Sequence, residues 1–98
     1  MIIAEVSITP LGKGESVSEY VAEAVKAFRE MGVKHTLTPM ATVLEVENLG
    51  TLWKAVEEAE KRVFQKGAKR VVVSIKIDHR IDREATMEKK VRSVEEKL

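Results

Sequence analysis

Polar and hydrophobic residues alternate in four stretches of this chain and recur at helical spacing in three others. Alternation with many β-branched residues predicts strands over residues 2–9, 34–38, 42–47 and 70–77. Apolar residues three and four positions apart predict helices over residues 16–31, 51–66 and 87–98. The order βαββαβ plus one helix predicts an α+β, ferredoxin-like fold with a four-stranded antiparallel sheet.

The boundaries of these elements carry residues that commonly begin or end a strand or helix. Pro10 is expected to stop the first strand, because proline cannot donate to a strand ladder. Ser16 and Glu19 form an S-x-x-E capping box for the first helix, and Thr86 is the expected cap of the last. Glycines 32 and 67 are placed to end the first two helices as left-handed caps. No linker or repeat separates the elements, so residues 1–98 are expected to form a single domain.

Large aromatic side chains are predicted to belong to the hydrophobic core. Tyr20, Phe28 and Trp53 lie on apolar helix faces, where a core position is the usual one. The predicted apolar face of the second helix consists of Leu52, Trp53, Val56, Ala59, Val63 and Phe64. The hydroxyl of Tyr20 is in addition a candidate group for the edge of a pocket.

One face of the predicted sheet has no helices to cover it, because two helices cover only one face of four strands. Period-two alternation places on the helix side Ile2, Ala4, Val6, Ile8, Leu44, Val46, Val71, Val73, Ile75 and Ile77. The other side, called the open face below, then carries Ile3, Glu5, Ser7, Val43, Glu45, Glu47, Val72, Ser74, Lys76 and Asp78. Its occupant is water, another subunit, or a polar ligand near the strand ends and the turn at residues 39–41.

The last predicted helix has a narrow apolar stripe, which indicates contact with one neighbouring surface, such as a second subunit. The stripe consists of Met87, Val91, Val94 and Leu98.

Composition restricts the classes of protein to which the chain can belong. A hydrophobic fraction of 44% and a charged fraction of 34% are incompatible with a disordered chain. The absence of cysteine excludes disulfides, thiolate metal sites and a cysteine nucleophile. Charge rich in Lys, Arg and Glu, with Asn48 and Gln65 as the only amides, is typical of thermophilic proteins. Because no signal peptide and no run of ~18 apolar residues is present, we expect a cytoplasmic protein with no membrane partner.

Nucleic acid is not expected as a partner either. The formal net charge is +1 with acids and bases interspersed, whereas phosphate binding normally needs a basic excess. RNA recognition motifs share this strand order, and they stack bases on aromatic residues of the first and third strands. Here the outward positions of those strands are aliphatic, hydroxyl-bearing or acidic, and none carries a ring.

Neither a catalytic constellation nor a metal or cofactor site is predicted. Ser7 and Ser74 have no histidine placed beside them, so the chain is not expected to be an enzyme. Asp78 and His79 are adjacent on a strand and point to opposite faces, which disfavours a shared metal ion.

A weak anion site is predicted at Lys13 and Gly14, where a loop leads into a helix N-terminus with free N–H groups. The segment lacks the spacing of a Walker loop and the third glycine of a dinucleotide fingerprint. A plain strand-to-helix turn is the alternative.

Six segments carry a family resemblance in order along nearly the whole chain. They are EVSITPLG at 5–12, SVSEYV at 16–21, LTPMAT at 37–42, SIKID at 74–78, MEKKV at 87–91 and SVE at 93–95. Together they resemble the signature of the thiamine-binding, YkoF-like family of small proteins. One departure is Ala41, where the family pattern has glycine after Pro-Met.

The resemblance implies a ferredoxin-like fold, assembly into dimers or tetramers, and non-enzymatic binding of thiamine or its hydroxymethylpyrimidine moiety. Carboxylates would offset the thiazolium cation, hydroxyls would bond the pyrimidine, Met40 would contact a ring, and Lys76 or Lys13 would hold a diphosphate. The candidate ligand-binding residues are Glu5, Ser7, Tyr20, Thr38, Met40, Thr42, Ser74, Lys76 and Asp78.

Two further hypotheses about function stay open at this point. One is a regulatory module in which subunit association, with an anion or another metabolite at the interface, is the function. It predicts self-association in the absence of thiamine. The other is a small hydrolase, whose turnover Ser7→Ala or Glu5→Gln would abolish.

Overall fold

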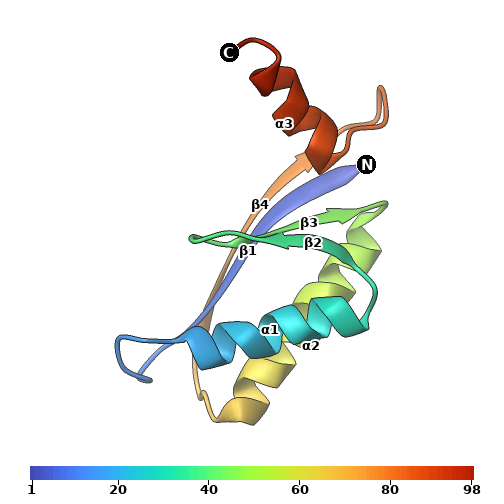
Figure 1. Ribbon diagram of the computed structural model, residues 1–98. Coiled ribbons are helices and arrows are strands. Elements are labelled where there is room, and N and C mark those ends of the chain that lie inside the picture. Colours follow the sequence, from blue (N-terminus) through green and yellow to red (C-terminus); the bar gives the residue numbers. More distant parts are fainter.

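The computed structural model describes residues 1–98 and confirms the predicted order of elements. Its strands are β1 (Ile2–Pro10), β2 (Lys34–Leu37), β3 (Thr42–Val46) and β4 (Val71–His79). Its helices are α1 (Ser18–Glu30), α2 (Leu49–Lys66) and α3 (Met87–Glu95). The strands form one sheet in the order β2-β3-β1-β4, and every neighbouring pair is antiparallel (Figure 1). This is the ferredoxin-like α+β fold with an added C-terminal helix.

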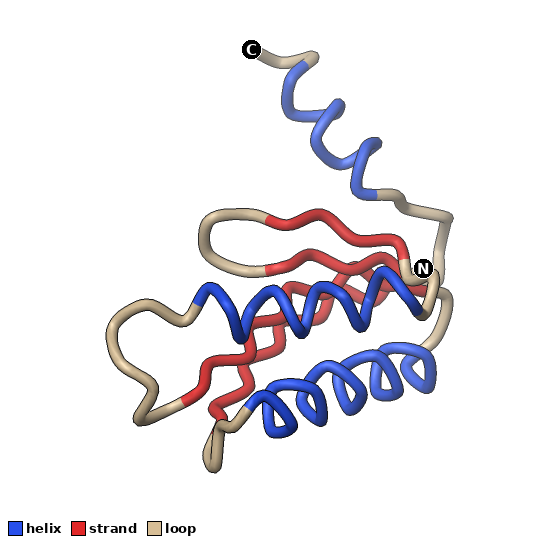
Figure 2. The backbone as a smooth tube through the Cα atoms, turned by 60° about the horizontal axis from the view of Figure 1, so that its bottom comes forward, coloured by secondary structure: helices blue, strands red, loops and turns tan.

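The hydrophobic core lies between the sheet and the pair α1 and α2, which run side by side across one face (Figure 2). The predicted alternation in β1 is confirmed, because Ile2, Ala4, Val6 and Ile8 are all buried. The inward residues of the edge strand β4 pack against the core less completely, and Ile77 remains 36% exposed. The outer helix α3 lies on the opposite side of the sheet from the other two helices (Figure 1).

The start of α1 differs from the predicted capping box. The helix begins at Ser18, its N-cap is Val17, and no side chain caps its first turn. Ser16 lies instead in the exposed loop before the helix, so the S-x-x-E prediction was wrong. The end of α1 agrees with the sequence: Gly32 has a φ of 70°, and Val33 N donates to the Phe28 carbonyl at 3.0 Å.

The other two helix starts are capped by side chains. Asn48 Oδ1 accepts a hydrogen bond from Thr51 N at 2.8 Å, and α2 consequently begins two residues earlier than predicted. Thr86 Oγ1 accepts from Lys89 N at 3.1 Å, which confirms the predicted cap of α3.

Pro10 lies within β1, although the sequence predicted that it would end the strand. The reason is its position relative to the two neighbouring strands. β1 pairs with β4 as far as Pro10 but with β3 only as far as Val6. Leu11 N donates to the Arg70 carbonyl on the β4 side, so the nitrogen of Pro10 faces the other edge, where no strand requires a donor.

Two aromatic residues of α2 were placed wrongly by the sequence. Trp53 is 48% exposed and Phe64 is 39% exposed, whereas the buried residues of this helix are Leu52, Ala55, Val56, Ala59 and Val63.

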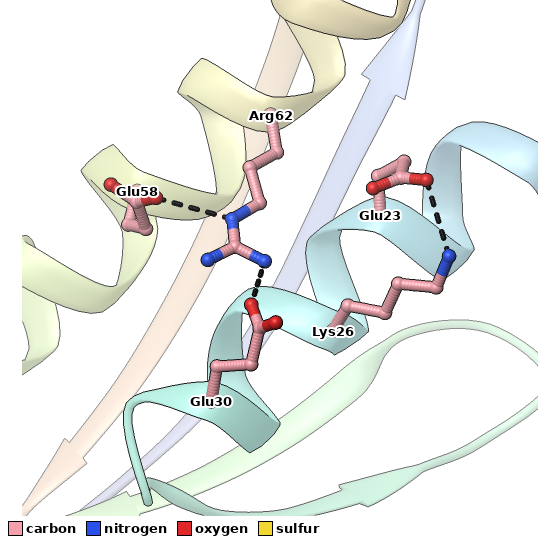
Figure 3. A network of polar contacts seen from close by, with 5 residues as sticks. All are labelled: Glu23, Lys26, Glu30, Glu58 and Arg62. Carbon is pink, nitrogen blue, oxygen red and sulfur yellow. Dashed lines mark hydrogen bonds and ion pairs between the residues drawn. The ribbon is translucent and has the colours of Figure 1, made fainter.

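Ion pairs join the outer sides of α1 and α2. Arg62 contacts Glu58 on its own helix and Glu30 on α1 (Figure 3). The ion pair between Arg62 and Glu30 links the two helices on the side away from the sheet.

Candidate functional site

A cavity of about 210 Å³ lies between the end of β1, one side of α1 and the β2–β3 turn. We call it the turn cavity. Its lining comes from residues 6–9 of β1, residues 37–42 around the turn, the N-cap residue Val17, and the α1 side chains Val21, Ala24 and Phe28. The cavity exists because β1 continues past the point where β3 ends, so α1 and the turn enclose space that a longer β3 would fill.

The turn itself is held by one side chain. Thr38 Oγ1 donates to the Ala41 carbonyl at 2.7 Å and accepts from Ala41 N at 3.1 Å, and Thr38 N also bonds the Ala41 carbonyl. No residue of the turn has a positive φ, so alanine fits where the family pattern has glycine. Met40 is 86% exposed at the tip, beside the mouth of the cavity.

The polar side chains that line the turn cavity are all hydroxyls, from Ser7, Thr9, Thr38 and Thr42. Ser7 and Thr9 lie 3.5 Å apart on β1, and Thr38 is engaged in the turn. Thr42 is only 5% exposed. Because no charged side chain lines the cavity, the site is suited to an uncharged polar group on an otherwise apolar ring.

The structure divides the predicted ligand-binding residues into two groups. Ser7, Thr38, Met40 and Thr42 come together around the turn cavity. Tyr20 packs against the core from α1 and does not line this cavity.

The second group lies along the open face, on paired strands. The register places Glu5 opposite Lys76 and Ser7 opposite Ser74, with Asp78 opposite Ile3. Glu5 and Lys76 are exposed, and Asp78 is engaged by Lys90 of α3 at 2.5 Å. Ser7 is thus the residue that connects the two groups.

Helix α3 is tethered over one end of the open face by polar contacts. Met87 N donates to Glu45 at 2.8 Å, and Lys34 contacts both Glu45 at 3.3 Å and Glu88 at 2.8 Å. Between the helix and the sheet lies a groove of about 600 Å³ with Ile3, Val43 and Val91 among its lining residues. The apolar stripe of α3 is otherwise uncovered: Val91 is 59%, Val94 60% and Leu98 98% exposed.

These tethers shift the pKa values of the carboxyl groups that form them. The hydrogen bond from Lys90 lowers the pKa of Asp78, and the hydrogen bond from Lys34 lowers the pKa of Glu88. In the loop before α3, the Arg80 guanidinium lowers the pKa of Asp82 to about 2. The charged forms of Asp78 and Glu88 therefore favour the observed position of α3.

The remaining candidate positions are separate from both regions. Lys13 Nζ lies beside Gly67, at the C-terminal end of α2, where its charge complements the helix dipole. No three His, Cys, Asp or Glu side chains come together as a potential metal site. Among the helices, none is both long enough and apolar enough to span a bilayer.

Sequence reasoning missed the contribution of Thr9, of the N-cap residue Val17 and of Val21 on α1 to the turn cavity. The strand pattern assigned Thr9 no role, because alternation alone does not show that β3 stops earlier than β1. The available signal was that the predicted strand at residues 2–9 is longer than the predicted strand at residues 42–47.

Comparison with known proteins identifies the family of this chain. A family model described as thiamine-binding protein matches residues 4–95. The chain belongs to the thiamine-binding protein family. Within this family it is 42% identical over 99 residues to a UPF0045 protein of Methanothermobacter thermautotrophicus, and the alignment covers all of both chains. A UPF0045 protein of Bacillus subtilis is 41% identical, over all of this chain and 98% of the relative.

Solved structures of similar proteins agree with the fold of this thiamine-binding family member. A hypothetical protein from Methanocaldococcus jannaschii superposes with a TM-score of 0.87 at 45% identity, covering 97% of this chain and 96% of that one. A domain of unknown function from Bacillus cereus superposes with a TM-score of 0.81 at 31% identity, covering 92% and 86% of the two chains.

Proposed function

We propose that this chain binds thiamine or its hydroxymethylpyrimidine moiety in the turn cavity and catalyses no reaction. The observation that carries the proposal is the combination of family membership with a cavity whose polar side chains are all uncharged. Four of the nine predicted ligand-binding residues line this one cavity: Ser7, Thr38, Met40 and Thr42.

The size and chemistry of the turn cavity favour the pyrimidine ring over the whole thiamine molecule. Drug-sized ligands occupy pockets of about 300–1,000 Å³, and the turn cavity measures about 210 Å³. An aminopyrimidine offers both hydrogen-bond donors and acceptors, which hydroxyl groups can match. The permanently charged thiazolium ring would lie outside, near the exposed side chain of Met40.

The lack of a nucleophile with an adjacent base supports a binding role without catalysis. The hydroxyls of the turn cavity have no histidine or carboxylate among the lining residues. The nearby His35 is committed to the protein itself, since its Nδ1 contacts the Val33 carbonyl at 2.7 Å and its ring packs against Phe28.

The test is a calorimetric titration of the folded protein with thiamine, thiamine diphosphate, hydroxymethylpyrimidine and, as a control, the isolated thiazole. We expect saturable binding of hydroxymethylpyrimidine and thiamine, with no binding of the thiazole. A ligand at 100 times its dissociation constant should also raise the unfolding free energy by about 2.7 kcal/mol. If a cooperatively folding protein bound none of the first three ligands, this ligand class would be wrong.

We further propose that the chain works as a dimer or tetramer that covers the open face and the α3 stripe. This is supported by apolar side chains left uncovered in a single subunit, including Val72, which is 50% exposed, and Val94, which is 60% exposed. Light scattering at micromolar concentration should give a mass that is a multiple of 11.0 kDa. Val91→Glu should lower that mass, whereas a wild-type mass near 11 kDa would contradict self-association.

A further inference from the structure

The end of β1 has a strand neighbour on only one of its two edges. β1 pairs with β4 along its whole length, from Ile2 to Pro10, but its pairing with β3 ends at Val6 and Thr42. Residues 7–10 therefore present a free main-chain edge on the side of the turn cavity, and residues 6–9 line that cavity.

Ile8 is the residue that presents both an N–H and a C=O on this free edge, since Pro10, which faces the same way, has only a carbonyl. Main-chain N–H and C=O groups of successive strand residues point to opposite edges, and Leu11 N points to the β4 edge because it bonds the Arg70 carbonyl at 2.9 Å. Ile8, an odd number of residues earlier, therefore points its N–H and C=O away from β4. No residue of the turn or of α1 hydrogen-bonds them. Ile8 as a whole residue is 6% exposed and lines the turn cavity, so a partner for these groups would lie in that cavity. Enclosed main-chain groups without a partner are rare in proteins.

Thr42 supplies a second, independent observation. The residue is 5% exposed and lines the turn cavity, and its hydroxyl, unlike that of Thr38, makes no hydrogen bond within the chain. No side-chain oxygen in this protein is both fully enclosed and unpartnered. The hydroxyl of Thr42 is therefore open to the cavity. Thr42 pairs with Val6, and the free edge of β1 begins directly after Val6.

We propose that the ligand pairs with the main chain of Ile8 as a further strand residue would, and that Thr42 determines which ring is accepted. The ring then carries an amine beside a ring nitrogen: Ile8 N–H donates to the nitrogen, and the amine donates to the Ile8 carbonyl. The Thr42 hydroxyl bonds another polar atom of the same uncharged ring. This inference rests on the proposed function, since it names the edge by which a pyrimidine would be recognised in the turn cavity.

The direct test is nuclear magnetic resonance of the ¹⁵N-labelled protein titrated with hydroxymethylpyrimidine. We expect the Ile8 amide to shift downfield and to exchange with solvent at least about tenfold more slowly when bound, because it gains a hydrogen bond in a closed site. The amide of Ala4, which lies in the middle of the β1–β3 ladder, is the internal control and should not change.

Two matched comparisons test the recognition itself. Thr42→Val keeps the shape of the side chain and should weaken binding about tenfold, because the ligand atom that it served is left unpaired. Thr36→Val, an identical substitution on β2 outside the turn cavity, should leave affinity unchanged. A pyrimidine that lacks the amine should bind the wild-type protein about tenfold more weakly, since the Ile8 carbonyl loses its donor.

The outcomes separate the two proposals. Binding with an unchanged Ile8 amide, and equal affinities for Thr42→Val and Thr36→Val, would overturn this inference while the proposed function stands. A folded wild-type protein that binds neither pyrimidine nor thiamine would overturn the proposed function itself, before any variant is compared.

Discussion

Phe28 and Phe64 are the two phenylalanines of the chain, and the fold gives them opposite environments. Phe28 is 1% exposed, belongs to the core, and lines the turn cavity. Phe64 is 39% exposed on the outer side of α2. The same substitution to alanine at both positions therefore measures how far burial determines the contribution of each ring.

Removing a fully buried phenyl group costs about 3–5 kcal/mol, because apolar burial is lost and a cavity is left behind. A domain of this length has a total stability of about 5–15 kcal/mol, so Phe28→Ala removes a large part of it. The expected fall in melting temperature is about 15–25 °C. Phe64→Ala should cost about 1 kcal/mol or less, since much of that ring already contacts water.

Thermal unfolding followed by circular dichroism, with urea unfolding as an independent measure, gives both values. The variants should be compared at one protein concentration, with their association states checked by light scattering, because subunit contacts also stabilise the folded state. Equal losses at the two positions would refute the reasoning, since they would mean that Phe64 is as well packed as Phe28.

Three other predictions follow from local features of the fold. The pKa values of Asp78 and Glu88 are lowered in the folded protein from their ordinary values of 3.8 and 4.5. Their ion pairs therefore favour docking of α3 when the pH is above those ordinary values, and this contribution is lost as the pH falls through the lowered pKa values. After correction for the slowing of intrinsic amide exchange as the pH falls, protection against exchange in α3 should therefore decrease between pH 5 and pH 3 while protection in α2 does not, and an equal decrease in both helices would contradict this. Asn48→Ala should cost about 1 kcal/mol in urea unfolding by removing the cap of α2, and Asn48→Asp should restore most of it. Gly32→Ala should cost about 1 kcal/mol, because a Cβ there meets no atom but the φ of 70° is strained for alanine; an unchanged midpoint would show that the backbone relaxes.

Much of the fold could be predicted from periodicity, because burial on one face of each strand imposes alternation. The inward residues of β1 and β3 were identified correctly for this reason. The same reasoning failed for Trp53 and Phe64, which lie at the margins of an apolar helix face. The buried residues of α2 instead include Ala55, which the predicted apolar face left out.

For the candidate site, the residues around the Pro39–Ala41 turn were named from the family resemblance, and the structure places them around one cavity. The carboxylates and Lys76, named with them, lie instead along the open face. Spacing in the sequence could not separate these groups, because Ser7 lines the turn cavity and also pairs with Ser74 on the open face.

The order of elements, the inward faces of β1 and β3, the ends of α1 and α2 at Gly32 and Gly67, and the start of α3 at Thr86 were thus encoded locally, in patterns a few residues long. Tertiary structure alone decided how far β1 extends beyond β3, and therefore the free main-chain edge at Ile8. It also decided the burial of Thr42 beside the turn cavity. The physical reason is that strand alternation specifies which way a side chain points, whereas a cavity depends on where the neighbouring strand stops.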